Sequence, residues 1–317
     1  MVAGDTGIAH EVFRNVAALE RLDAAFARKR HAMNSQYATV IIPAYNEEAV
    51  IARTLSTLMR KHGGSADFAI IVVCNGCSDG TASLVREKFP QIDVIELEVG
   101  SKIAALNAGL VAASPGPVLL LDADVELDTT SAHALLAAVR REGIEAAIGR
   151  MQIDATGADW LVRAFYSVWL EHPYLRNGKF AAAIALSAAG RARVGTLPMV
   201  IADDTYLRRL IPREQVALVE SVHFLVRVPR KLATLVRVRS RSHRGTRQLG
   251  DHALPQAGGQ RTEAWGMIRR VCLRPSLWLA LPVYIGVTVA ARLLSRLNSR
   301  THWERDQTSR VAAGNAS

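Results

Sequence analysis

Short apolar runs alternate with segments of helical periodicity through the first 128 residues. Residues 118–121 are four consecutive apolar side chains, as in a strand buried on both faces. Similar runs occupy residues 38–42, which we expect to stop at Pro43, and residues 68–73 and 94–97. Between them, apolar residues recur at spacings of three and four, which predicts helices. Strands that alternate with helices predict right-handed crossovers and a parallel sheet covered on both faces.

The pattern loosens after residue 128. We expect a helix to residue 141, a strand near 146–153 and a helix near 159–171. The predicted fold is therefore α/β, a Rossmann-like, doubly wound and mostly parallel sheet with a mixed second half. The domain prediction is an N-terminal amphipathic helix at 1–35, an α/β domain at 36–250 with halves at 36–128 and 129–250, a linker at 251–261, and a basic, apolar helical segment at 262–317.

Charge is concentrated in the last third of the chain. Lys and Arg exceed Asp and Glu by ten, and residues 227–247 hold eight basic side chains and no acidic one. Such a distribution implies an anionic partner: a diphosphate, acidic lipid headgroups or nucleic acid.

Residues 275–291 carry no charge and are flanked by arginines. A spanning helix needs about 20 apolar residues, so this stretch is short for one. A buried core helix is the alternative. Among so many arginines we favour membrane contact, as one short span or as an interfacial hairpin.

Three cysteines, at 74, 77 and 272, are too few for a disulfide scaffold and favour a reducing compartment. Residues 74–77 spell C-x-x-C, but no second ligand pair is nearby, so we interpret them as a turn. Residues 1–17 lack the apolar core of a signal peptide. These features predict a location on the cytoplasmic side.

Asp122 and Asp124 follow the strand at 118–121 directly. Ligands bind at the carboxyl edge of an open α/β sheet, and residues 122 and 124 of an extended chain point to the same side. Two hard oxygen ligands suit Mg²⁺ or Mn²⁺, which usually carries substrate phosphates. The sequence therefore predicts a divalent cation here.

Polar segments also follow the other predicted strands, at 43–48, 75–81 and 100–102, and a further acidic segment lies at 202–207. In order and spacing, these segments together resemble the family 2 glycosyltransferases. These are inverting enzymes of the GT-A fold that use nucleotide-sugars. The resemblance covers residues 36–250.

The resemblance implies roles for individual residues. The nucleotide-sugar would be bound by Pro43, Tyr45, Glu47, Asn75, Asp79, Lys102 and Asp122. Asp122 and Asp124 would hold the metal, and Asp204 would be the general base that accepts the acceptor's proton. The family more often has acidic and Ser residues where this chain has Cys74 and Cys77, so one base contact departs from its pattern.

Processive members of the family carry a Gln-x-x-Arg-Trp motif. Here Val238 and Ser242 replace its Gln and Trp, while Arg241 matches its Arg, which argues against polymer synthesis. Arg241 and Arg244, three residues apart on a helix, could grip a diphosphate. Asp203 is assigned with them to the part of the site that meets the diphosphate or the acceptor.

We therefore predict a non-processive enzyme that transfers one sugar, with inversion, to a hydroxyl of a lipid-linked or cell-surface glycan precursor. It would work at the cytoplasmic face of the cell membrane, against anionic lipids, without nucleic acid. One alternative is a sugar-phosphate nucleotidyltransferase, which needs a Gly-rich loop that residues 43–48 lack. The other is a non-enzymatic basic protein that binds lipid or nucleic acid, which leaves the strand-end carboxylates unexplained.

Overall fold

The computed structural model describes residues 37–60, 68–176, 178, 180–199, 202–249 and 260–297. The predicted N-terminal helix at 1–35, most of the predicted linker and residues 298–317 lie outside the described residues.

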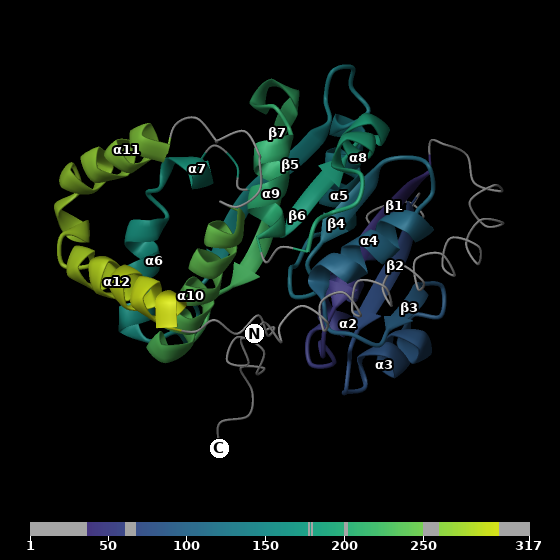
Figure 1. Cartoon of the computed structure of the whole chain (residues 1–317), viewed down its shortest axis with the longest axis horizontal. Coiled ribbons are helices and arrows are strands. Elements are labelled where there is room, and N and C mark those ends of the chain that lie inside the picture. Colours follow the sequence, from purple (N-terminus) through teal and green to yellow (C-terminus); the bar gives the residue numbers. More distant parts are fainter. Residues whose placement is uncertain are drawn as a thin grey trace, which may run out of the picture.

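The described residues form one seven-stranded sheet with the order β3-β2-β1-β4-β6-β5-β7 (Figure 1). The strands are β1 (Ala38–Ala44), β2 (Phe68–Asn75), β3 (Asp93–Leu97), β4 (Val118–Leu121), β5 (Ala146–Asp154), β6 (Ala183–Leu186) and β7 (Val216–Arg227). The first four are mutually parallel, and β6 runs antiparallel to both β4 and β5. The predicted parallel first half and mixed second half are therefore confirmed.

The expected end of the first strand at Pro43 is wrong. Strand β1 continues through Pro43, which is in register with Val73 of β2. Pairing of β1 with β4 ends at Ile41. Beyond that point β1 has a neighbour on one side only, so a residue without an amide hydrogen is tolerated there.

Helices cover both faces of the sheet. On one face lie α2 (Ile51–Leu58), α3 (Thr81–Lys88) and α5 (Thr129–Ala138), packed on strand residues such as Val40 and Ile42. On the other lie α4 (Lys102–Ala112), α8 (Ala188–Val194) and α9 (Asp203–Leu210), packed on Ile41 and its neighbours. Because alternate residues of β1 enter opposite cores, the strand is apolar except at Thr39, whose buried hydroxyl accepts a hydrogen bond from the N–H of Ser114.

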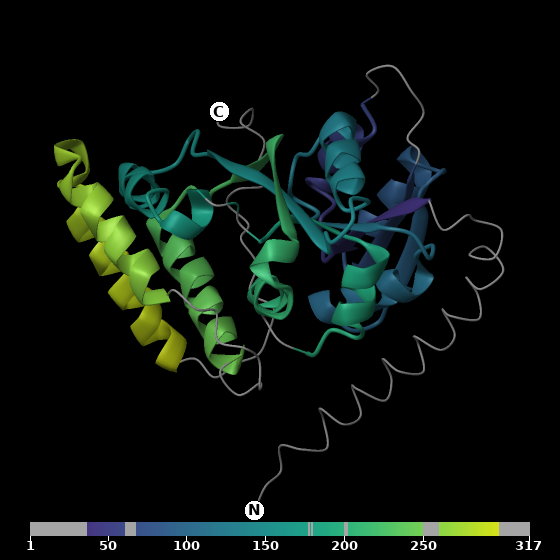
Figure 2. The same cartoon turned by 90° about the horizontal axis from the view of Figure 1, so that it is seen from above.

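A third group of helices stands beside the β7 end of the sheet (Figure 2). It comprises α6 (Trp160–Trp169), α7 (Pro173–Arg176), α10 (Leu232–Gln248), α11 (Gln260–Cys272) and α12 (Leu281–Leu297), with a 3₁₀ turn, η3 (Pro275–Leu277), between the last two. Helix α12 packs on α6 and α10, and the ring of Tyr284 stacks on Phe165 at 5.2 Å between centroids. None of the helices in the described residues has both the length and the apolarity needed to cross a bilayer.

Candidate active site

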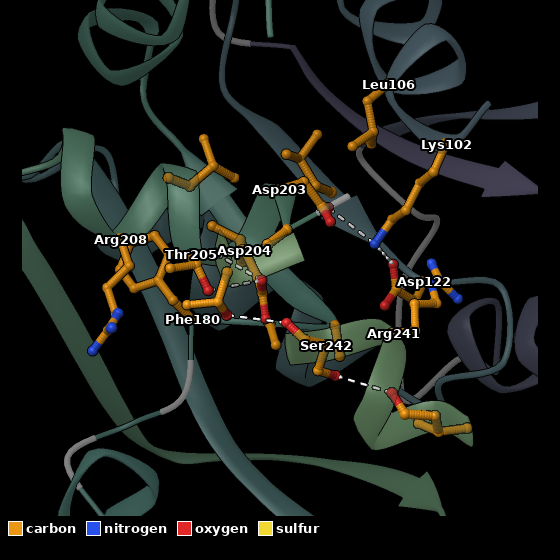
Figure 3. A pocket seen from close by; sticks show the side chains of 18 of the residues that line it. Lys102, Leu106, Asp122, Phe180, Asp203, Asp204, Thr205, Arg208, Arg241 and Ser242 are labelled. Carbon is orange, nitrogen blue, oxygen red and sulfur yellow. Dashed lines mark hydrogen bonds and ion pairs between the residues drawn. The ribbon is translucent and has the colours of Figure 1, made fainter. Parts of the chain in front are cut away.

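A cavity of about 530 Å³ opens where the carboxyl end of β4 meets α4, α9 and α10 (Figure 3). Its polar lining includes Lys102, Asp122, His172, Asp203, Asp204, Arg208, Arg239, Arg241, Ser242 and His243. Leu106, Phe180 and Ile184 supply apolar wall. The cavity therefore lies at the sheet edge where the sequence predicted ligand binding.

Lys102 joins two carboxylates at the floor of this cavity. Its Nζ lies 2.7 Å from Oδ1 of Asp122 and 3.0 Å from Oδ2 of Asp203 (Figure 3). Helix α4 begins at Lys102 because the hydroxyl of Ser101 accepts a hydrogen bond from the backbone N–H of Ala104. A cation in a first helical turn opposes the helix dipole, so the two carboxylates account for its placement.

Burial and neighbouring charges both shift the pKa values of Asp122 and Lys102. Burial raises the pKa of Asp122, and the nearby Asp203 and Asp124 add to that rise, while Lys102 opposes it. Burial also disfavours the charged form of Lys102, but the two carboxylates outweigh burial and raise the pKa of Lys102 above its ordinary value. The ammonium group therefore stays charged and holds the floor of the cavity together.

Asp203 and Asp204 open α9. Two carboxylates in the first turn are stabilised by the positive end of the helix dipole. The Oδ1 of Asp204 accepts a hydrogen bond of 2.6 Å from the backbone N–H of Thr205 and one of 3.2 Å from its hydroxyl. Asp203 faces Lys102, so the two neighbouring carboxylates have different partners within one cavity.

A buried amide on α4 holds the segment between α8 and α9. The Nδ2 of Asn107 donates to the carbonyl of Leu197 at 3.0 Å, and the N–H of Leu197 donates to Oδ1 of Asn107 at 2.9 Å. Asn107 lies on α4 as Lys102 does, so the same helix carries the lysine and fixes a segment that leads toward Asp203.

The structure separates the two arginines that the sequence grouped. Arg241 lines the cavity near Asp122 (Figure 3). Burial lowers the pKa of Arg241, against the opposing effect of Asp203 and Asp122. Arg244 is buried outside the cavity lining, and its Nη1 donates to the hydroxyl of Ser240 at 3.3 Å.

Four basic cavity residues were not singled out from the sequence. They are His172, Arg208, Arg239 and His243. Arg208 follows Asp204 by one helical turn on α9, a spacing that places both on one helix face and could have identified it. His172 offers no comparable sequence signal, because it lies after α6, far from the motifs. His243 directly follows Ser242 of the compared motif, and that position could have identified it.

Both histidines are held neutral. Burial lowers the pKa of His172 to about 4, assisted by the positive charges of Arg239 and Arg208. Burial likewise lowers the pKa of His243 to about 4, assisted by Arg239, Arg292 and Arg247. At neutral pH these imidazoles can therefore donate and accept hydrogen bonds without adding charge.

A second group of predicted residues gathers at the ends of β1 and β2, outside the lining of this cavity. Asn75 donates from Nδ2 to the carbonyl of Ala44 at 2.7 Å. Asp79 accepts from the backbone N–H of Thr81 at 3.1 Å and of Glu48 at 3.3 Å. Glu47 is buried and donates its N–H to the hydroxyl of Thr81 at 2.8 Å.

These contacts connect the strand-end loops to one another. Tyr45, which follows β1, lies against Gly100, and Gly100 in turn lies against Gly76. Gly76 has φ +62, a conformation that favours glycine, and its backbone leaves no room for a side chain beside Gly100. The predicted turn at residues 74–77 is wrong in its first half, because β2 continues through Cys74 to Asn75 and the chain bends only at Gly76. Pro43, Tyr45, Glu47, Asn75 and Asp79 share one edge of the sheet.

The carboxylates predicted as metal ligands are not arranged as in an extended chain. A turn follows Asp122, with a hydrogen bond of 3.2 Å from the N–H of Val125 to the carbonyl of Asp122. Asp124 is exposed and lies outside the cavity lining, although its charge acts on Asp122 and Arg241. The expectation of an extended backbone here is wrong, because the strand ends at Leu121.

The donor set still fits a hard divalent cation. Among the described residues, no group of three or more His, Cys, Asp or Glu side chains is close enough to hold a metal alone. Mg²⁺-type sites commonly use one or two carboxylates and complete their shell with substrate phosphates and water. Asp122 and Asp124 can supply such a partial set.

Comparison with known proteins places this arrangement in context. Residues 39–189 match the family described as glycosyl transferase family 2. The chain is 28% identical over 133 residues to a probable glycosyltransferase, YdaM, of Bacillus subtilis (strain 168), which covers 39% of this chain and 32% of the relative. It is 33% identical over 104 residues to validoxylamine A glucosyltransferase of Streptomyces hygroscopicus subsp. limoneus, which covers 32% of this chain and 23% of the relative. The chain thus spans about a third or less of the length of these relatives.

The fold resembles that of a solved mannosyltransferase, PcManGT from Pyrobaculum calidifontis, whose structure contains GDP-Man and Mn²⁺. The TM-score is 0.54 at 19% sequence identity, over 90% of this chain and 85% of the other. This likeness confirms the predicted GT-A fold.

Proposed function

We propose, from the match of residues 39–189 to the model described as glycosyl transferase family 2, that the protein transfers one sugar from a nucleotide-diphosphate-sugar to an acceptor hydroxyl with inversion. The observation that carries the proposal is the bridge of Lys102 between Asp122 and Asp203 at the floor of the cavity. This bridge places a cation and two carboxylates at the carboxyl edge of β4. The cation suits a diphosphate, and the carboxylates suit the metal ion that accompanies it.

The nucleoside end of the donor would lie along the edge formed by the loops after β1 and β2. There Tyr45 offers an aromatic ring, and Asn75 and Asp79 offer polar atoms. The diphosphate would then reach Lys102 and Arg241, two cations that flank Asp122. Guanidinium and ammonium groups are the side chains best suited to bind phosphate oxygens.

Inversion requires a base on the face of the sugar opposite the leaving group. Asp204 suits that role, because it lines the cavity and Lys102 pairs with Asp203 instead. The Thr205 N–H and hydroxyl fix Oδ1 of Asp204, which orients the carboxylate toward a bound acceptor. Asp204 would take the acceptor's proton as the acceptor oxygen bonds to the sugar and the bond to the diphosphate breaks.

A divalent cation, Mn²⁺ or Mg²⁺, would be held by Asp122 and Asp124. When bound, it would neutralise charge on the departing nucleoside diphosphate. The presence of Mn²⁺ beside GDP-Man in the Pyrobaculum enzyme supports a divalent cation, and the position of Asp122 and Asp124 after β4 supports these two ligands.

The acceptor would enter on the side of α10 and would be a lipid-linked or cell-surface glycan precursor. That side of the cavity combines the neutral imidazoles of His172 and His243 with Arg208 and Arg239. Neutral hydrogen-bonding groups suit sugar hydroxyls. The replacement of two of three residues of the processive motif by Val238 and Ser242 favours transfer of a single sugar.

A panel of nucleotide-sugars with Mn²⁺ tests the proposal. A donor present at about 100 times its dissociation constant stabilises the fold by about 2.7 kcal/mol, and the melting temperature rises accordingly. We expect one nucleotide-sugar to raise the melting temperature more than the others and to be hydrolysed slowly only with the metal. If every nucleotide-sugar leaves the melting temperature and its own integrity unchanged, the proposal is wrong.

A further inference from the structure

The hairpin formed by α11, η3 and α12 exposes an unusual amount of apolar side chain. Thirteen large hydrophobic residues in the described part of the chain are exposed, and nine of them lie in this hairpin. An apolar partner would therefore bind here. Leu279 is 90% exposed, Leu273 72% and Trp265 70%. We call the outward side of residues 265–297 the hairpin surface.

Helix α12 is apolar on both of its sides. One side buries Val287 and Ala291 against α6 and α10. The opposite side exposes Ile285, Val289 and Leu293, which are spaced by four residues and form one stripe. A helix that packs on a core by one face normally presents polar residues on the other. The exposed apolar stripe of α12 therefore has the character of a binding surface.

Positive charge accompanies this stripe. Arg292 and Arg296 are exposed on α12, and Arg269 is exposed on α11. Glu263 is the sole acidic residue in the sequence from 260 to 297. Trp265 on α11 and Trp278 at the end of η3 are exposed as well. Exposed apolar and aromatic side chains, together with arginines, match the two contacts that an anionic bilayer surface offers.

We propose that the hairpin surface docks in the interface of an anionic lipid bilayer, with α12 lying in the plane of the membrane. The apolar stripe would enter the acyl boundary, and Arg269, Arg292 and Arg296 would meet the phosphates of the headgroups. From the uncharged run at 275–291, the exposed side chains of Trp278, Leu279, Ile285 and Val289 contribute to this contact.

Charge complementarity selects a lipid surface over a second copy of this chain. A two-fold interface places the same patch on both partners, so two positively charged surfaces would face each other. Anionic headgroups satisfy the same arginines without that repulsion.

Docking would also orient the cavity. Helix α10 lies between the cavity and the hairpin surface. Its residues Arg241 and Ser242 line the cavity, and its other side packs on α12. The guanidinium of Arg247 on α10 donates to the carbonyl of Ser295 on α12. The catalytic cavity would therefore be held one helix away from the lipid, whichever sugar it takes, and this inference does not depend on the proposed function.

Vesicle co-sedimentation of the full-length chain tests the proposal. We expect binding to phosphatidylcholine vesicles that contain phosphatidylglycerol, and much weaker binding to pure phosphatidylcholine. The double variant Ile285→Glu/Val289→Glu should abolish sedimentation, because it places two charges in the apolar stripe. Arg292→Gln/Arg296→Gln should weaken binding to the anionic vesicles about 25-fold, since each arginine near such a surface contributes about fivefold.

Met199→Glu is the matched control, because Met199 is 51% exposed but lies between α8 and α9. It should bind vesicles as the wild type does. The melting temperatures of all variants should stay close to that of the wild type, since the substituted side chains are exposed.

Two results would overturn the proposal. One is a wild-type chain that fails to sediment with anionic vesicles at low salt. The other is a wild-type dimer, measured by light scattering, that Ile285→Glu/Val289→Glu converts to monomer while vesicle binding persists, which would assign the stripe to a second copy.

Discussion

The ammonium nitrogen of Lys102 lies 3.0 Å from Oδ2 of Asp203, although the two residues begin different helices, α4 and α9. Lys102 also bonds Asp122 at the end of β4, so one side chain ties together three elements that surround the cavity. Removing the cation would leave two carboxylates facing each other, and this consequence can be measured.

Lys102→Met should lower the free energy of unfolding by about 1–3 kcal/mol at pH 7. This loss lies between the cost of breaking an exposed ion pair and the cost of breaking a fully buried one. Without Lys102, the pKa of the Asp122 carboxyl rises further. A carboxyl whose pKa is raised in the folded state destabilises the fold when it ionises, so the deficit should shrink as the pH falls toward 4. Denaturant unfolding at pH 7 and pH 4 measures both effects. Lys88→Met, at an exposed lysine on α3, is the control and should show neither.

Asp122→Asn and Asp124→Asn should each remove metal-dependent donor binding, because each replaces an anionic ligand by a neutral one. Asp128→Asn is the matched control: Asp128 caps α5 by accepting from Ser131, and asparagine caps equally well. Calorimetric titration of the donor with and without Mn²⁺ distinguishes the variants. Unchanged metal-dependent binding in both the Asp122 and the Asp124 variants would contradict the assignment of these residues as metal ligands.

Asp204→Asn should keep donor binding and lower sugar transfer by about 10²- to 10⁴-fold, the usual contribution of a general base. Asparagine retains an oxygen for the hydrogen bond from Thr205, so the local fold should persist. Transfer is measured by product formation at saturating donor. Asp203→Asn is the informative comparison, because it disturbs the Lys102 bridge and should weaken donor binding. Near wild-type transfer by Asp204→Asn would place the base elsewhere, with Asp203 the next candidate.

The neutral histidines predict a loss of stability in mild acid. His172 and His243 have pKa values of about 4 in the folded protein and about 6.5 when unfolded. Between these values the unfolded chain binds more protons, so their contribution to stability is present above pH 6.5 and is lost as the pH falls to 4. His172→Gln/His243→Gln should flatten the dependence of the unfolding free energy on pH across this window. An identical slope in the variant and the wild type would contradict the assignment.

Asn107→Ala should lower the free energy of unfolding by about 1–3 kcal/mol, because the buried carbonyl and N–H of Leu197 both lose their partner. It should also weaken donor binding, since the segment that leads to Asp203 is released. Ala105→Gly, on the same helix, is a control for helix destabilisation alone. Loss of stability without any change in donor affinity would limit Asn107 to a structural role.

The sequence alone determined the first half of the fold and the position of its functional edge. Runs of apolar residues can form buried strands wherever they lie, and a polar segment after each strand must emerge at the carboxyl edge of a parallel sheet. Asp122 was therefore assigned correctly to that edge without coordinates, whereas the turn predicted at residues 74–77 begins later, because β2 extends to Asn75. The end of β1 was missed because proline's cost depends on which neighbouring strand is present, a property of the sheet.

Tertiary structure decided which charged residues meet. Sequence spacing placed Arg241 and Arg244 together. One side of α10 faces the cavity and another side packs on α12, so of these two arginines only Arg241 reaches the cavity. His172, Arg208 and Arg239 join the site through packing between distant segments, which local patterns do not encode. The uncharged run at 275–291 gave the apolar character of α12, and its packing on α6 and α10 decided which side of that helix remains exposed, because burial depends on neighbours that the local sequence does not contain.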